Sequence, residues 1–132
     1  IFKVESPVDA SKITKANFLK NLKIFKQLNK ATNNKPWVML SSGMSKQNFI
    51  ECLNLAYKSG ASGYLAGRSI WLSAFEKYPN LKEVELGLKK SINYMQKLNK
   101  LTKTNAKSME KYLTKNFKLN NPKKFTDQFK KF

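Results

Sequence analysis

The fold is decided by residues 36–71, whose sequence is PWVMLSSGMSKQNFIECLNLAYKSGASGYLAGRSIW. It opens with a short apolar run, 37–40, which is typical of a strand covered on both faces in a parallel sheet. Residues 46–58 then carry apolar side chains at helical spacing, behind Ser45, a favourable N-cap. A second short apolar run covers 64–66. Strand, helix and strand in this order predict a parallel α/β fold.

A further strand is predicted at the start of the chain, where Phe2 and Val4 favour extended structure and Pro7 marks its end. Side chains alternate between the two faces of a strand, so Lys3 and Glu5 share the face opposite the apolar pair. Because the chain begins within this pattern and without Met, we expect that an upstream portion precedes it or sits in another chain.

Amphipathic periodicity predicts four more helices, over residues 10–33, 70–78, 81–101 and 106–117. In the long helix at 81–101, the expected core face consists of Val84, Leu88, Ile92, Met95 and Leu98. We predict one structural unit over residues 1–117 and a Lys-rich surface tail over 118–132.

The formal charge of +18 arises from 26 Lys and Arg residues against 8 Asp and Glu residues, and Arg68 is the only arginine. Such a charge suits a nucleic-acid partner, because neutralised phosphates release counterions. Proteins that bind phosphates or base edges favour the bidentate Arg fork, however, and this chain uses lysine almost throughout. Solvated surface lysines are therefore the favoured interpretation, and a nucleic-acid partner is disfavoured. The same bias makes the position of Arg68 informative.

The chain has no His and one Cys, which excludes a His-based triad, a His metal cluster and an internal disulfide. Cys52 alone favours a reducing, cytoplasmic compartment. The apolar runs are far shorter than the roughly 20 residues needed to cross a bilayer, so no membrane association is expected.

Small and polar residues follow two of the predicted strands, as Ser41-Ser42-Gly43 and Gly67-Arg68-Ser69. Ligands of parallel α/β folds bind at the carboxyl ends of strands, and each segment here precedes a helix N-terminus that favours an anion. Glycine also serves the geometry of such turns without any ligand. Together, and with the single arginine in one of them, the two segments indicate a phosphate site.

Lys3 is the candidate for covalent chemistry. On the inner face of a buried strand, desolvation would lower the pKa of its amine and leave it able to attack a carbonyl and form a Schiff base. The alternative is a structural ion pair with Glu5, and the spacing alone does not decide between them.

Three segments resemble the class I tagatose-1,6-bisphosphate aldolases and their sulfofructose-phosphate aldolase relatives. They are FKVESPV (2–8), PWVMLSSG (36–43) and GASGYLAGRSIW (60–71), and they resemble the sixth, seventh and eighth strands of that family's (βα)8 barrel. The resemblance covers about the first two-thirds of the chain. It implies an α/β fold that is the C-terminal half of a TIM barrel, with additional C-terminal helices.

The resemblance also assigns roles to residues. It implies that Lys3 forms the Schiff base. Glu5 is placed on the same strand face two residues away, where it could tune the pKa of the Lys3 amine, and is not assigned as the general base. The phosphate-binding residues that it implies are Ser41, Gly43, Leu65 through its backbone, Gly67 and Arg68. Ser42 departs from the family, which more often has Ala there.

The implied reaction cleaves a ketose 1,6-bisphosphate to dihydroxyacetone phosphate and glyceraldehyde 3-phosphate, without metal or cofactor. The general base is expected on an earlier strand, in the N-terminal half of the barrel that this chain lacks, and a homo-oligomer is expected. The alternatives are an aldolase of sulfofructose phosphate or another sugar phosphate, and a non-catalytic barrel or basic nucleic-acid-binding fragment.

Overall fold

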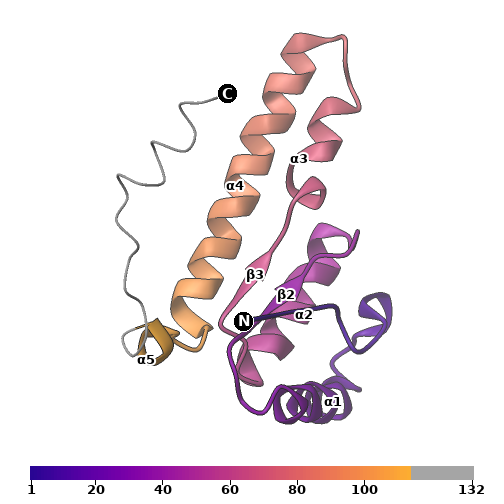
Figure 1. Cartoon of the computed structure of the whole chain (residues 1–132). Helices are drawn as coiled ribbons and strands as arrows, with labels where there is room; N and C mark the ends of the chain where they lie inside the picture. The colour runs from indigo at the N-terminus through magenta and orange to yellow at the C-terminus, as the bar shows by residue number, and fades with distance from the viewer. Residues whose placement is uncertain (114–132) are drawn as a thin grey trace, which may run out of the picture.

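The computed structural model describes residues 1–113 (Figure 1). A parallel sheet of order β1-β2-β3 is combined with helices, which confirms the predicted mixed α/β class. The elements along the chain are β1 (Phe2–Val4), the 3-10 helix η1 (Ala10–Lys12), α1 (Phe18–Ala31), β2 (Trp37–Leu40), α2 (Lys46–Lys58), β3 (Gly63–Leu65), α3 (Arg68–Phe75), α4 (Leu81–Asn105) and α5 (Glu110–Leu113).

The register of the sheet shows which residues share each of its two faces. Val4, Met39 and Tyr64 lie side by side in one row, and all belong to or pack against the buried core. The adjacent row consists of Lys3, Val38 and Gly63. Because successive side chains alternate between faces, this second row points away from the helices.

The core lies between the sheet and helices α1, α2 and α4. Helix α2 contributes most to it, since six of its residues are buried, and in Figure 1 it runs behind the strands. Burying large apolar side chains in this way stabilises the fold by roughly 1.5–3 kcal/mol for each side chain. The largest fully buried side chains are Trp37, Phe25, Phe49, Met39, Leu53, Leu55, Leu98 and Cys52.

The central strand is anchored through the indole of Trp37, which is fully buried and needs a partner for its N–H. The indole Nε1 donates to Asn29 Oδ1 at 2.9 Å. The same amide donates from Nδ2 to Asn34 Oδ1 at 2.8 Å. Asn29 also packs against Gly60, where a Cβ would stand 3.1 Å from Asn29 Oδ1 and where φ is +101°. One amide therefore joins the end of α1, the start of β2 and the turn after α2.

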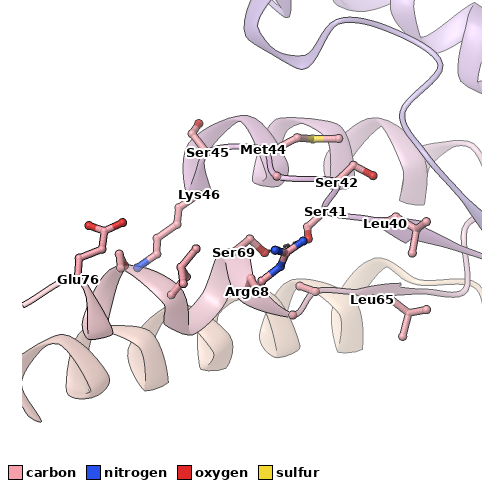
Figure 2. Close-up of a pocket in the computed structure, with 15 residues that line it drawn as sticks. Leu40, Ser41, Ser42, Met44, Ser45, Lys46, Leu65, Arg68, Ser69 and Glu76 are labelled. Atoms are coloured by element: carbon pink, nitrogen blue, oxygen red, sulfur yellow. Dashed lines mark hydrogen bonds between the residues drawn. The ribbon is translucent and has the colours of Figure 1, made fainter. Parts of the chain in front are cut away.

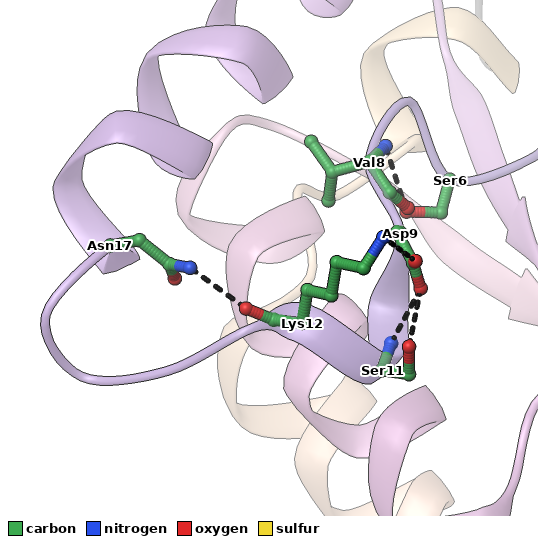
Figure 3. Close-up of polar contacts among 6 residues, drawn as sticks. All are labelled: Ser6, Val8, Asp9, Ser11, Lys12 and Asn17. Carbon is green, nitrogen blue, oxygen red and sulfur yellow. Dashed lines mark hydrogen bonds and ion pairs between the residues drawn. The ribbon is translucent and has the colours of Figure 1, made fainter.

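The helix predicted over residues 10–33 is wrong in its first third, because α1 begins only at Phe18. Side chains hold the preceding segment in a different conformation (Figure 3). Asn17 Nδ2 donates to the carbonyl oxygen of Lys12 at 2.7 Å, and Asn17 Oδ1 accepts from the Thr14 N–H at 2.9 Å. Side-chain hydrogen bonds of this kind give the backbone an alternative to the helix.

Asp9 fixes the start of η1 in the same segment (Figure 3). Its carboxylate accepts from the hydroxyl of Ser11 at 2.6 Å and from the Ser11 N–H at 3.0 Å, and it pairs with Lys12 at 3.0 Å. The Ser11 hydroxyl first, and then Lys12, lower the pKa of Asp9 to about 2. The carboxylate cap is therefore charged at any ordinary pH.

The predicted helix over 46–58 and its cap are confirmed, since Ser45 Oγ accepts from the N–H of Asn48 at 3.2 Å. The predicted strands are confirmed, with β3 one residue earlier than expected. The helix expected over 70–78 is shifted: α3 begins at Arg68 and ends at Phe75.

The predicted division of the chain near residue 117 falls outside the structure. Helix α4 ends at Asn105, and α5 begins at Glu110. Residues 114–117 and the predicted tail over 118–132 lie outside the described residues. Within residues 1–113, no helix combines the length and the apolar character needed to span a membrane.

The core face predicted for α4 is wrong at Ile92 and Met95, which are 50% and 41% exposed. Ser91 and Tyr94 are buried instead. The reason is a close contact with α3, beside which α4 runs in Figure 1. A Cβ on Gly87 would stand 2.7 Å from the Cα of Ala74. Gly87 and Ala74 are therefore in contact where α4 meets α3. A prediction of the core face from large apolar side chains does not identify such small residues.

We predict that Gly87→Ala lowers the melting temperature of the protein. Alanine is favoured over glycine in a helix by about 1 kcal/mol, but here its methyl group would overlap the backbone of α3. Thermal unfolding followed by circular dichroism measures the effect. The control is Leu86→Ala on the neighbouring exposed position, which should change stability by no more than about 0.5 kcal/mol. A higher melting temperature for Gly87→Ala would contradict the close-contact argument.

Candidate functional site

A pocket of about 790 Å³ lies at the carboxyl ends of β2 and β3 (Figure 2). Its walls are the loop between β2 and α2, the loop between β3 and α3, and the first turns of the two helices. Parallel strands place all their carboxyl ends at one edge of the sheet, so segments more than twenty residues apart in sequence meet there. This is the edge at which ligands of open parallel sheets bind.

The loop after β2 turns sharply because two successive residues adopt left-handed backbone conformations. Ser42 has φ of 40° and Gly43 has φ of 75°. The Met44 N–H donates to the Ser41 carbonyl oxygen at 2.8 Å and closes the turn. Since nothing lies within 4 Å of the position of a Cβ on Gly43, this side of the turn is open to a ligand.

Ser41 joins the two loops. Its N–H donates to the Leu65 carbonyl oxygen at 3.1 Å, which continues the pairing of β2 with β3 one step beyond the strands. Its hydroxyl accepts from Ser69 Oγ at 2.9 Å. Ser41 is itself buried, whereas Ser69 is half-buried. The two hydroxyl groups therefore lie together on the wall of the pocket.

Two helices begin at the pocket. The first N–H groups of a helix have no partner within it, and they carry a partial positive charge. Ser45 satisfies one of these donors at α2. At α3 the cap residue is Gly67, no side chain caps the helix, and the Ile70 N–H donates to the Gly67 carbonyl oxygen at 2.9 Å. Neither helix has an acidic residue in its first turn.

The charged residues that line the pocket are Lys46, Arg68 and Glu76, which together give it a net positive charge. Figure 2 shows Lys46 at the start of α2, with its side chain extending toward the side of the pocket where Glu76 lies, and Arg68 at the start of α3, beside Ser41 and Ser69. The ion pairs found among residues 1–113 lie elsewhere, at η1 and within α4. Neither cation of the pocket is therefore neutralised by a carboxylate in the described structure. Hydroxyl groups, helix N-termini and unpaired cations are the groups that bind a phosphate.

All the residues predicted for phosphate binding line this pocket, namely Ser41, Gly43, Leu65, Gly67 and Arg68. Their role as phosphate ligands stays a prediction. The sequence analysis did not identify Lys46 and Glu76 as site residues. One feature of the sequence could have identified Lys46 as a site residue. It directly follows Ser45, the cap of the helix that begins after the loop at residues 41–43.

Lys3 lies outside the pocket wall but on the same face of the sheet as Leu40, which lines it. Lys3 pairs with Val38, two residues before Leu40 on the neighbouring strand. From the rise and spacing of strands, the Cα atoms of Lys3 and Leu40 stand about 8 Å apart. The backbone of Lys3 therefore lies close to the rim of the pocket.

The predicted burial of Lys3 is wrong for the described residues, because its side chain is exposed. The reason is that β1 is an edge strand, and its face opposite the helices is open. The alternative for Lys3 was a structural ion pair with Glu5. Among residues 1–113, these two side chains form no ion pair. Glu5 is also exposed.

The single thiol plays no part in the site. Cys52 is buried in the core, and burial raises the pKa of its thiol, although a hydrogen bond to Ser6 Oγ at 3.4 Å opposes the shift. In the described part of the chain, no three His, Cys, Asp or Glu side chains gather in a group that could hold a metal ion. The chemistry available at this edge is that of Lys3, the hydroxyl groups and the cations.

The family model of the DeoC/LacD family aldolases matches residues 1–73, more than half of the chain. The chain belongs to this family of aldolases. The matched segment contains the three strands found among the described residues, both loops of the pocket and every predicted site residue. Membership supports an aldolase function in general. The match ends within α3, so the rest of α3, α4 and α5 lie beyond it.

We expect Arg68→Ala to weaken the binding of inorganic phosphate. A charge-assisted hydrogen bond contributes roughly 1.5–3 kcal/mol, so the dissociation constant should rise about 10- to 100-fold. Isothermal titration calorimetry measures the change. The matched control is Lys82→Ala, which removes an equal charge from an exposed position of α4 outside the pocket. Equal losses in the two variants would mean that only the overall charge of the protein matters.

Proposed function

We propose that this aldolase cleaves a ketose 1,6-bisphosphate, with tagatose 1,6-bisphosphate as the substrate, through a Schiff base on Lys3. The observation that carries the proposal is the arrangement at the open face of the sheet. Lys3 stands there with its Cα about 8 Å from the Cα of Leu40, which lines a pocket whose cations are unpaired among the described residues. A Schiff-base aldolase needs these two functions at such a separation, because the reacting carbonyl and a phosphate belong to the same substrate.

The phosphate would bind between the two loops. Arg68 offers a bidentate guanidinium, and the N–H groups at the start of α3 face the same pocket. The hydroxyl groups of Ser41 and Ser69 complete the set of donors. Because the loops are already joined through Ser41, the site requires little ordering when the ligand binds.

The proposed reaction begins with attack of the Lys3 amine on the ketone carbon of the substrate, with loss of water, to give an iminium. A general base takes the proton of the C4 hydroxyl, and the bond between C3 and C4 breaks. The electron pair of that bond moves toward the iminium nitrogen and leaves an enamine. Glyceraldehyde 3-phosphate departs first. Protonation of the enamine at C3 and hydrolysis then release dihydroxyacetone phosphate and the free amine.

The proposal assigns the general base to a strand outside this chain. Glu5 lies two residues from Lys3, on the same face by strand alternation, and is proposed only to tune the pKa of the amine. A three-stranded parallel sheet whose two edges are open within residues 1–113 is expected to pair with further strands. We therefore propose that the chain forms the C-terminal half of a (βα)8 barrel. The other half would cover Lys3 and supply the base, and such barrels would associate as a homo-oligomer.

Borohydride trapping tests the proposed nucleophile. The complete protein is incubated with dihydroxyacetone phosphate and sodium borohydride, digested and analysed by mass spectrometry. We expect a reduced adduct on Lys3. Lys3→Arg should abolish both the adduct and the cleavage activity, because the guanidinium is not a nucleophile at neutral pH. The matched variant Lys20→Arg, on an exposed position of α1, should retain both. Full activity of Lys3→Arg would remove the Schiff-base proposal.

A parallel assay addresses the substrate. Cleavage rates are compared for tagatose 1,6-bisphosphate, fructose 1,6-bisphosphate and sulfofructose 1-phosphate, with glyceraldehyde 3-phosphate detected through a coupled dehydrogenase in the first two cases. The highest kcat/KM is expected for tagatose 1,6-bisphosphate. Faster cleavage of the sulfonated sugar would instead favour the sulfofructose-phosphate aldolase alternative.

A further inference from the structure

Tyr94 of α4 contacts Lys46 of α2 in two places, although 48 positions separate the two residues in sequence. The phenolic hydroxyl of Tyr94 donates to the backbone carbonyl oxygen of Lys46 at 3.2 Å. The Lys46 ammonium lies 5.3 Å from the centre of the Tyr94 ring. The hydroxyl group thus fixes the backbone of the first turn of α2, and the ring fixes the charged end of the same residue.

The ring contact restricts where the Lys46 ammonium can go. A lysine side chain has four rotatable bonds and loses up to about 2 kcal/mol of rotamer entropy when it is fixed. A cation over a tyrosine ring is attracted by the ring face and recovers part of that cost. Tyr94 is itself buried, so it is a rigid support. Burial, with a smaller contribution from Tyr64, raises the pKa of Tyr94 to about 12, and its hydroxyl remains a donor at physiological pH.

The charge held in this way is available to a ligand. Lys46 lines the pocket, where Figure 2 shows its side chain extending from the start of α2. Lys46 is half-buried, and no carboxylate pairs with it in the part of the chain that the structure describes. Glu76 is the acidic residue of the pocket wall, and it leaves the two cations of the wall in excess. An ammonium that is positioned but not paired is suited to receive an anion.

We propose that Lys46 is a second phosphate-binding cation of this pocket, acting together with Arg68, and that Tyr94 is its positioning residue. The inference rests on the proposed function, because it deepens the description of the same phosphate site. Two cations on opposite walls favour a dianionic phosphate over a neutral hydroxyl group or a single negative charge. Lys46 therefore contributes to selection for substrates with a phosphate at this end.

Binding of inorganic phosphate tests the proposal without any cleavage step. The complete protein is titrated by calorimetry as wild type and as Lys46→Met, which keeps the length of the side chain and removes the charge. We expect the dissociation constant to rise about 10- to 100-fold, as for Arg68. Lys82→Met, on an exposed position of α4 outside the pocket, should stay within about twofold of wild type. Equal binding by wild type and Lys46→Met would overturn the role of Lys46.

The positioning role of Tyr94 is tested by two substitutions and a double-mutant cycle. Tyr94→Phe keeps the ring and should bind phosphate within about twofold of wild type. Tyr94→Leu removes the ring and should weaken binding about two- to fivefold. In the Lys46→Met background, Tyr94→Leu should have no further effect, because its action requires the ammonium. An equal loss with and without Lys46 would show that Tyr94 acts only through stability.

Repeating the titrations in a Lys3→Ala background separates this inference from the proposed reaction. Loss of the Schiff base should leave the difference between wild type and Lys46→Met unchanged. If no adduct forms on Lys3 in the trapping experiment but Lys46→Met still weakens phosphate binding, the anion site stands and the aldol mechanism fails. If wild-type protein does not bind phosphate, the proposal for Lys46 fails.

Discussion

The parallel pairing of β2 with β3 is the constraint on which the site depends. It aligns the carboxyl ends of the two strands, and the hydrogen bond from the Ser41 N–H to the Leu65 carbonyl oxygen extends it into the loops. Without this alignment, the turn at Gly43 and the start of α3 would not face one another. The hydroxyl contact between Ser69 and Ser41 would be lost as well. The pocket is therefore a direct consequence of sheet register.

Alternation of side chains along the paired strands separates residues that pack against the helices from residues on the opposite face of the sheet. Alternation directs Met39 and Tyr64 to the helices, where they are stabilised by packing, and it directs Lys3 to the opposite face. Lys3 is exposed because β1 is the edge strand, whereas Val38, on the same face of the central strand, is buried. A strand with one face in the core and one face toward a ligand can tolerate a charged residue only on the second face. The position of Lys3 follows from this rule.

The predictions from sequence succeeded where the signal was local and failed where side chains competed with the backbone. The strand at 37–40 and the helix capped by Ser45 follow from a continuous apolar run and a hydroxyl at the cap, and both are present. The amide of Asn17 bonds to the Lys12 carbonyl oxygen, and no periodicity of apolar residues reveals such a bond.

The residues predicted to bind phosphate line one pocket, and their role stays a prediction, whereas Lys46 and Glu76 line the same pocket without having been predicted. Glycine and the single arginine after two strands indicated the pocket, because these residue types have specific backbone and charge properties. Lys46 was hidden among many lysines, and its support, Tyr94, belongs to a helix far along the chain. The inner face of α4 was misassigned for a related reason, since Gly87 contributes through the absence of a side chain. Contacts between distant segments, and contacts made by small residues, leave little trace in a single sequence.

Gly87 and Tyr94 belong to the same helix, α4, and are seven residues apart, which is nearly two full turns. They lie on the same side of α4 and are separated by about 10 Å along its axis. Gly87 fixes α3, which carries Arg68 at its start, and Tyr94 fixes Lys46. Through these two contacts, α4 sets the spacing between Arg68 and Lys46. A change of helix register by one residue would therefore alter the separation of Lys46 and Arg68 without any substitution in the pocket wall.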